Sequence, residues 1–133
     1  MQHGASILVV DDDADCREVV AMLLEGEGHA VATVPDGAEA LRTLEEEPAP
    51  DLVVLDLMMP RINGAEVLSA MRADGRLRDV PVVLVSAAPP TLYEALRRDP
   101  LVRVAPKPIE VDAFLAAIAS LLPRTARTTV TGM

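Results

Sequence analysis

Leu52-Val53-Val54-Leu55-Asp56 is a short apolar run that ends on a carboxylate, and the chain repeats this pattern. Ile7-Leu8-Val9-Val10 leads into Asp11-Asp12-Asp13, and a third run, residues 101–105, is followed by Lys107. Short, bounded, β-branched runs are typical of buried parallel strands. Because ligands bind beyond the carboxyl ends of such strands, three carboxylates and one ammonium group are expected to meet in one crevice.

Strand-like and helix-like segments alternate five times along the chain. Strands are expected at residues 7–11, 29–34, 51–56, 80–86 and 101–105. Asp13 and Asp36 are the expected caps of the first two helices, and Asn63-Gly64 marks a turn before the third. The fourth helix, about residues 91–98, is expected to be short and weak, whereas the fifth has a clear stripe of Phe114, Leu115, Ile118, Leu121 and Leu122. Five such units with right-handed crossovers predict an α/β fold with a doubly wound parallel sheet, in a strand order that periodicity leaves open.

The length of 133 residues fits a single domain, expected at residues 6–122. Residues 1–5 would be an N-terminal extension. The polar, Thr-rich residues 123–133, after the expected helix stop at Pro123, would be a disordered tail or the start of a linker.

The composition excludes several classes of function. A net charge of −9 argues against nonspecific binding to nucleic acid or to anionic membranes, because phosphate groups attract clustered Lys and Arg. Neither a signal peptide nor an apolar stretch of about 20 residues is evident. The only cysteine, Cys16, cannot form an internal disulfide and lies on an apolar stripe, so it is interpreted as a packed residue in a reducing cytoplasm.

Carboxylates at neighbouring strand ends suggest a cation site. Like charges raise the pKa of at least one of such groups unless a counter-charge is present. Mg²⁺ binds carboxylate oxygens and bridges to phosphate, with Asp12 and Asp56 as the expected ligands. Lys107 would add a second positive charge and Ser86 a hydroxyl, and a carboxylate can itself be the nucleophile in phosphoryl transfer. Alone, an Asp pair is more often a helix cap and a Lys-Pro pair more often surface; the joint placement at three strand ends favours function.

The chain resembles the receiver domain of two-component response regulators over roughly residues 6–122. The resemblance is carried, in order and at the family's spacing, by residues 7–13, 36–41, 51–60, 63–64, 81–87 and by Lys107-Pro108. As a set these segments are highly specific. The resemblance implies a (βα)5 flavodoxin-like fold with strand order 2-1-3-4-5.

The resemblance also implies roles for individual residues. Asp56 would accept a phosphoryl group from the phosphohistidine of a sensor histidine kinase or phosphotransfer protein. Mg²⁺ (or Mn²⁺) would be held by Asp12, Asp56 and the backbone carbonyl of Met58, with Asp11 assisting through a water. Ser86 and Lys107 would contact the phosphoryl oxygens, and the bond between Lys107 and Pro108 would be cis.

Some residues depart from the family pattern. The family often places a Tyr or Phe three residues before the lysine as a rotameric switch, and here that position is Val104. Pro106 and Pro89-Pro90 stiffen segments that usually move. Met58 and Ala88, where the family positions a hydrolytic water, cannot bind water through their side chains, which implies slow loss of the phosphoryl group. Tyr93, if exposed on the fourth helix, is the candidate partner contact.

The sequence is therefore interpreted as a phospho-accepting signalling domain, not an enzyme for an external substrate. It would act by docking a downstream protein or by relaying the phosphoryl group. The alternative is a constitutive interaction module with the same fold, for which Val104 is the best support. A haloacid dehalogenase-like enzyme also uses an Asp nucleophile and Mg²⁺, but it requires a second Asp where this chain has Met58.

Overall fold

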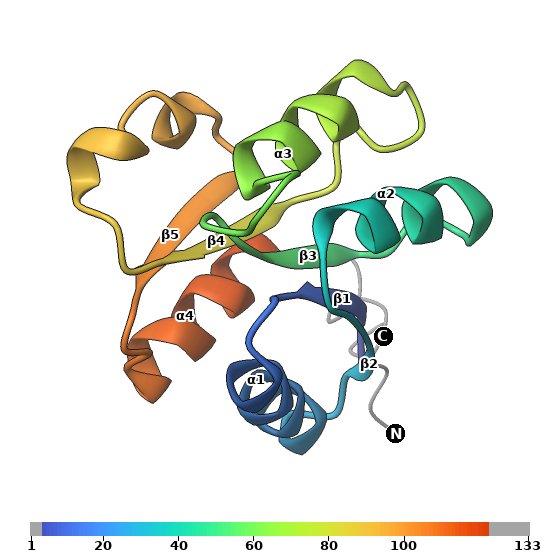
Figure 1. The fold of residues 1–133 in the computed structure, drawn as a ribbon. Helices are drawn as coiled ribbons and strands as arrows, with labels where there is room; N and C mark the ends of the chain where they lie inside the picture. The colour runs from blue at the N-terminus through green and yellow to red at the C-terminus, as the bar shows by residue number, and fades with distance from the viewer. Residues whose placement is uncertain (1–3, 123–133) are drawn as a thin grey trace.

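A parallel five-stranded sheet runs through the computed structural model, which describes residues 4–122 (Figure 1). The strands are β1 (Ser6–Val10), β2 (Ala30–Val34), β3 (Leu52–Asp56), β4 (Val82–Ser86) and β5 (Val102–Pro106). Their order is β2-β1-β3-β4-β5, so the flavodoxin-like fold and the strand order implied by the resemblance are confirmed. Because β1 pairs with both β2 and β3, the ends of β1 and β3 lie side by side.

Four α-helices of the described chain cover the two faces of the sheet: α1 (Ala14–Gly26), α2 (Gly37–Glu46), α3 (Gly64–Ala73) and α4 (Val111–Leu121). In Figure 1, α2 and α3 lie above the sheet, and α1 and α4 lie below it. The side chains of Asp13 and Asp36 cap α1 and α2 as predicted. Asn63 is more than a turn residue, because it forms both bonds of a capping box with Glu66.

The predicted fourth helix is wrong. Residues 90–98 form two short 3₁₀ turns, η1 (Pro90–Leu92) and η2 (Leu96–Arg98). Between Pro90 and Pro100 the 3₁₀ turns have no side-chain cap and the segment buries only Tyr93, so neither capping nor packing stabilises an α-helix there. Tyr93, the candidate partner contact on the condition that it is exposed, is only 5% exposed and does not meet that condition, whereas its neighbour Leu92 is 60% exposed.

The core has two layers, one on each face of the sheet. Alternate strand residues face opposite sides, so Leu8 and Val10 join the layer under α2 and α3, whereas Ile7 and Val9 join the layer under α1 and α4. Phe114 is the largest side chain fully buried in the second layer. Both layers cover β3 and β4, which are buried along their whole length. The carboxyl ends of these two strands are thereby held rigidly.

Several strand bounds differ slightly from the prediction. Asp51 lies outside β3, and its side chain instead accepts a hydrogen bond from the Ser6 N–H. β5 extends to Pro106. An edge strand tolerates a proline because no further strand lies on its outer side to accept the N–H that proline lacks. Pro123 and the predicted tail at residues 123–133 lie outside the described residues. Among residues 4–122, no helix has the length and apolar character needed to cross a membrane.

Candidate functional site

Three carboxylates meet at the carboxyl edge of the sheet, as the strand pattern predicted. Asp11 and Asp12 follow β1, and Asp56 ends β3. One oxygen from each carboxylate lies within 4.8 Å of the others. Asp11 and Asp56 are buried at 3% exposure each, whereas Asp12 is exposed. Two carboxylates of the cluster are therefore buried, and the third faces solvent.

Local backbone bonds hold Asp11 at the end of β1. Its N–H donates to the Val34 carbonyl of β2 at 3.3 Å. Its Oδ1 accepts from the Asp13 N–H at 2.9 Å, which closes a tight turn. Asp13 in turn accepts from the N–H groups of Asp15 and Cys16 and so begins α1. The third member of the acidic run is thus a helix cap, and the first two remain for the cluster.

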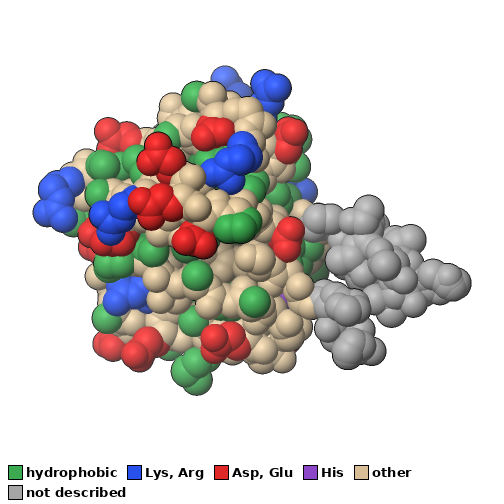
Figure 2. Space-filling model, turned by 90° about the vertical axis from the view of Figure 1, so that its right-hand side faces the viewer, with side chains coloured by type: hydrophobic (Ala, Val, Ile, Leu, Met, Phe, Trp, Pro, Cys, Tyr) green, Lys and Arg blue, Asp and Glu red, His purple; other side chains and the backbone are tan. Residues whose placement is uncertain are grey.

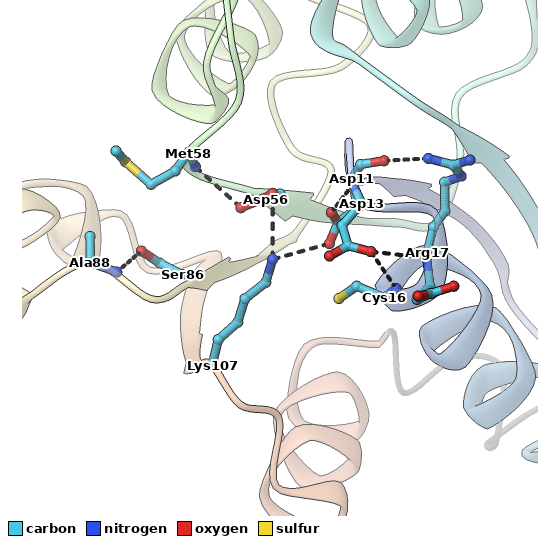
Figure 3. A network of polar contacts seen from close by, with 10 residues as sticks. Asp11, Asp13, Cys16, Arg17, Asp56, Met58, Ser86, Ala88 and Lys107 are labelled. Carbon is cyan, nitrogen blue, oxygen red and sulfur yellow. Dashed lines mark hydrogen bonds and ion pairs between the residues drawn. The ribbon is translucent and has the colours of Figure 1, made fainter.

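Lys107 brings an ammonium group between the two buried carboxylates (Figure 3). Its Nζ lies 3.4 Å from Asp11 Oδ2 and 3.5 Å from Asp56 Oδ2. These distances exceed the 2.7–2.9 Å typical of a charge-assisted hydrogen bond, so the cation is shared and bound tightly to neither group. The backbone N–H of Lys107 donates to the Ser86 carbonyl at 2.8 Å, and the Lys107–Pro108 peptide is cis.

The electrostatics of this cluster disfavour full ionisation. Burial, reinforced by the charge of Asp11, raises the pKa of Asp56 from 3.8 to about 7. Lys107 and the Met58 N–H oppose this rise but do not cancel it. Burial alone would lower the pKa of Lys107, yet the charges of Asp56 and Asp11 outweigh it and the net shift is upward. A further positive charge among the carboxylates would therefore be stabilising.

Ser86 and Met58 flank Asp56 on the side away from Asp11 (Figure 3). Ser86 is 1% exposed, and its Oγ accepts from the Ala88 N–H at 2.9 Å. The Met58 N–H donates to Asp56 Oδ1 at 3.2 Å, while the Met58 side chain is 56% exposed. Behind Met58, Gly64 packs so closely that a Cβ would lie 2.5 Å from the Asp56 carbonyl oxygen. A glycine is required there for α3 to begin against the end of β3.

Two predicted residues lie apart from the carboxylate cluster. Val104 is half-buried and packs, with Leu96, against the core layer under α2 and α3. Tyr93 is buried between the two 3₁₀ turns. Neither side chain has a polar contact with the cluster among the described residues, so any part they play would be indirect.

Cys16 is half-buried near the cluster and packs against the core layer under α1 and α4, as interpreted from the sequence. Burial, together with a hydrogen bond to Asp11, raises the pKa of its thiol to about 12. The reactive thiolate form is therefore rare at neutral pH.

The sequence reasoning missed Arg17. Its Nη1 donates to the Asp11 backbone carbonyl at 2.8 Å. A basic residue in the first turns of a helix that starts at the site was the available signal. It was overlooked because five acidic residues surround it between positions 11 and 18.

The donor set of the cluster suits a hard divalent cation. Its members are carboxylate oxygens, with no sulfur or imidazole nitrogen within the cluster. Mg²⁺ prefers such oxygens and keeps several waters, which the exposed side at Asp12 would admit. The residues present therefore fit Mg²⁺, and Mn²⁺ shares this ligand preference.

Comparison with known proteins agrees with this geometry. The family model described as response regulator receiver domain matches residues 7–119. The chain is 46% identical over 86 residues to the DNA-binding response regulator MtrA of Mycobacterium tuberculosis (strain H37Rv), a match covering 65% of this chain and 36% of that protein. It is 38% identical over 120 residues to the response regulator MprA of Mycolicibacterium vanbaalenii, covering 90% and 51%. The chain thus spans about a third to a half of these relatives.

Solved structures show the same similarity. The chemotaxis response regulator CheY4 of Vibrio cholerae superposes with a TM-score of 0.82 at 25% identity, covering 90% of this chain and 100% of that one. The N-terminal domain of a response regulator receiver protein from Methanoculleus marisnigri superposes with a TM-score of 0.70 at 36% identity, covering 90% and 98%.

Proposed function

The chain belongs to the response regulator receiver family, the signalling domains of two-component systems, and on that premise we propose that Asp56 is its phosphoryl acceptor. One observation carries the proposal. Of the two buried carboxylates beside Lys107, Asp56 is the one that Ser86 and Met58 also flank, on the side away from Asp11. The donor would be the phosphohistidine of a sensor histidine kinase or of a phosphotransfer protein.

The transfer is a displacement at phosphorus. An Asp56 carboxylate oxygen forms a bond to phosphorus, the bond from phosphorus to the donor's imidazole nitrogen breaks, and its electron pair stays on the imidazole. Asp56 must be ionised to attack, although burial and Asp11 raise its pKa to about 7. Lys107, 3.5 Å from Oδ2, favours the ionised form and would pair with a phosphoryl oxygen as negative charge builds up there.

Asp12, Asp56 and the Met58 carbonyl would hold Mg²⁺ or Mn²⁺, with Asp11 assisting through a water. When bound, the ion would neutralise charge on the phosphoryl oxygens. The partial exposure of the cluster at Asp12 supports this assignment, because the ion and its waters need an open side.

Ser86 is suited to donate to a phosphoryl oxygen. Its Oγ already accepts from the Ala88 N–H, so the hydroxyl hydrogen is free to point toward Asp56. Because the backbone carbonyl of Ser86 is bound to the Lys107 N–H, the two side chains arise from adjacent, mutually fixed strand ends.

The output would be a protein partner or a phosphorelay in the cytoplasm. We do not expect residues 4–122 to bind nucleic acid directly. On the face shown in Figure 2, Lys and Arg side chains lie among acidic ones and form no continuous basic patch. A phosphate backbone attracts a patch of clustered positive charge.

The second candidate is a constitutive interaction module in which phosphorylation is not used. Val104 favours it, because a half-buried valine with one stiff torsion cannot swing between two positions as a ring can.

Incubation with acetyl phosphate and Mg²⁺, followed by intact-mass spectrometry, tests the proposal. The wild-type chain should gain one phosphoryl group, and Asp56→Asn should gain none. Asp79→Asn is a matched control, because Asp79 is exposed and lies away from the site. Phosphorylation of Asp56→Asn at normal stoichiometry would show that the acceptor is wrong. A wild-type chain that binds Mg²⁺ but gains no mass would favour the constitutive module.

A further inference from the structure

Arg17 links the first turns of α1 to the backbone of the acidic cluster. It is the fourth residue of α1, and its half-buried guanidinium reaches back to the end of β1 (Figure 3). There Nη1 donates to the Asp11 carbonyl oxygen at 2.8 Å. Arg17 is the only residue among 4–122 whose side chain donates to this carbonyl oxygen.

This carbonyl belongs to the peptide unit that joins Asp11 to Asp12. A peptide unit is planar and rigid, so fixing its oxygen fixes the plane and the direction in which the chain enters Asp12. The neighbouring groups are held from elsewhere: the Asp11 N–H by Val34 and the Asp13 N–H by Asp11 Oδ1. The unit between them is tied by Arg17.

We propose that Arg17 is a positioning residue for Asp12, the exposed member of the proposed metal-binding cluster. The inference rests on the proposed function, because it assumes that the cluster binds Mg²⁺. Asp12 is not held by surrounding packing as Asp11 and Asp56 are. The orientation of the Asp12 carboxylate therefore depends on the backbone that carries it. When Arg17 fixes the peptide plane before Asp12, less conformational entropy of Asp12 is lost on metal binding.

A simple charge effect would act in the opposite direction. Arg17 carries a positive charge beside the cluster, and a cation at that place repels Mg²⁺. If charge were its only influence, removal of Arg17 would strengthen metal binding. If Arg17 positions Asp12, removal weakens metal binding, so the sign of the change separates the two.

Isothermal titration with Mg²⁺ tests the inference on the wild-type chain, Arg17→Met and Arg17→Lys. Loss of groups that orient a ligand typically weakens metal affinity by about 10-fold to 100-fold, and Arg17→Met is expected near the lower limit of about 10-fold. Arg17→Lys keeps a donor and the charge, so it should recover part of the affinity. Competition with Mn²⁺, in which free Mn²⁺ is measured by electron paramagnetic resonance, gives an independent value of the Mg²⁺ affinity.

Arg42→Met is the matched control. It removes the same charge from α2, where Arg42 pairs with Glu39 on the surface at 2.5 Å, and it should leave the Mg²⁺ affinity unchanged. Tighter binding by Arg17→Met would overturn the inference. So would an unchanged affinity accompanied only by a lower melting temperature without metal. If wild type and Arg17→Met bind Mg²⁺ with equal affinity, the proposed role of Arg17 is wrong but the metal site stands. If wild type does not bind Mg²⁺ at all, the proposed metal site is wrong.

Discussion

β3 and β4 are neighbouring strands that are both fully buried, yet the chain segments that follow them are built very differently. The first contains α3, which has a capping box and buries Val67, Leu68 and Met71 in the core. The second, residues 87–101, contains only η1 and η2, neither of which has a side-chain cap. Tyr93 is the only buried residue of this segment. The same sheet therefore presents Asp56 beside a rigid element and Ser86 beside a weakly anchored one.

The difference suggests where a response to phosphorylation would occur. Segments with few buried contacts and short helical turns open at low free-energy cost, whereas core helices open only with the whole domain. Ser86 lies at the junction between buried β4 and the weakly anchored crossover. A change in the hydrogen bonds of Ser86 is thus more easily passed to residues 87–99 than a change at Asp56 is passed to α3.

Truncation of one buried side chain in each crossover gives the largest expected effect. Met71→Ala should lower the free energy of unfolding by about 2–5 kcal/mol, because Met71 is fully buried in the core. Tyr93→Ala should lower it clearly less, since residues 87–99 can open without exposing the main core. Urea titrations followed by circular dichroism measure both. Equal losses would mean that the two crossovers are anchored equally well.

The ion pair between Arg72 and Asp99 ties the weak crossover to α3. Arg72 Nε lies 2.6 Å from Asp99 Oδ2, and Arg72 Nη1 donates to the Val80 carbonyl at 2.8 Å. Asp99→Asn should lower the free energy of unfolding by about 1–2 kcal/mol at pH 7, because a partly buried guanidinium loses its counter-charge. Amide exchange should accelerate across residues 90–99 more than in α3.

The pH dependence of this loss has a defined sign. Burial raises the pKa of Asp99, but the hydrogen bonds from Arg72 and from the Leu101 N–H outweigh it, and the net shift is downward from 3.8. The contribution is therefore present above pH 3.8 and disappears as the pH falls through the folded-state value. Wild type and Asp99→Asn should converge in acid. If the stability difference between wild type and Asp99→Asn stayed constant down to acid pH, the charge of the Asp99 carboxylate would not be what stabilises its contact with Arg72.

The acceptor side should show the opposite pH dependence. The pKa of Asp56 is raised from 3.8 to about 7 in the folded chain, chiefly by burial and then by Asp11. Below pH 3.8 the carboxyl is neutral in both states. As pH rises toward 7 the unfolded chain loses this proton first, so the carboxyl's contribution to stability falls and is lost above pH 7.

Without divalent cations, Asp56→Asn should therefore be more stable than wild type at pH 8, and the difference should shrink as the pH falls toward 4. Thermal melts in the presence of a chelator measure the difference. Asp79→Asn, at an exposed position, serves as the control with no expected pH-dependent gain. If Asp56→Asn were less stable than wild type at pH 8, burial and the charge of Asp11 would not disfavour the ionised Asp56 carboxylate as described.

The contrast between the crossovers also explains what the sequence could predict. The caps at Asp13 and Asp36 and the runs that end at Asp11 and Asp56 are local patterns, and the structure reproduces them. The burial of Tyr93 depends on how residues 87–99 fold back on the sheet, which no periodicity shows. Strand order came only from the family resemblance, because hydrophobic runs do not specify their neighbours.

Arg17 illustrates a second limit of the sequence. In a run of acidic residues it looks like a solvated counter-charge, and its contact with a backbone carbonyl is visible only once α1 is placed against β1. A side chain that binds backbone leaves no partner residue in the sequence to point to it.

The smallest expected effect is the conformational change itself. Val104 has one stiff torsion and packs with Leu96 against the core, so it cannot rotate inward as an aromatic switch residue would. Ser86 and Lys107 can still move toward a phosphoryl group, which adds about −1.5 to −2 charges at neutral pH. Their movement reaches the segment that starts at Ala88, whose N–H is bound to Ser86 Oγ, and Pro89 and Pro90 restrict how far it travels.

Beryllofluoride, a mimic of the phosphoryl group, should therefore shift amide resonances mainly at residues 86–93 and 104–108. α3 should be almost silent, and α4 should change little. The same titration on Asp56→Asn, which lacks the acceptor carboxylate, should produce no shifts. Large shifts along the whole of α4 would show that a global switch operates without an aromatic residue at position 104. Large shifts in α3 would break the contrast directly, because they would mean that the well-anchored crossover, and not the weak one, carries the response.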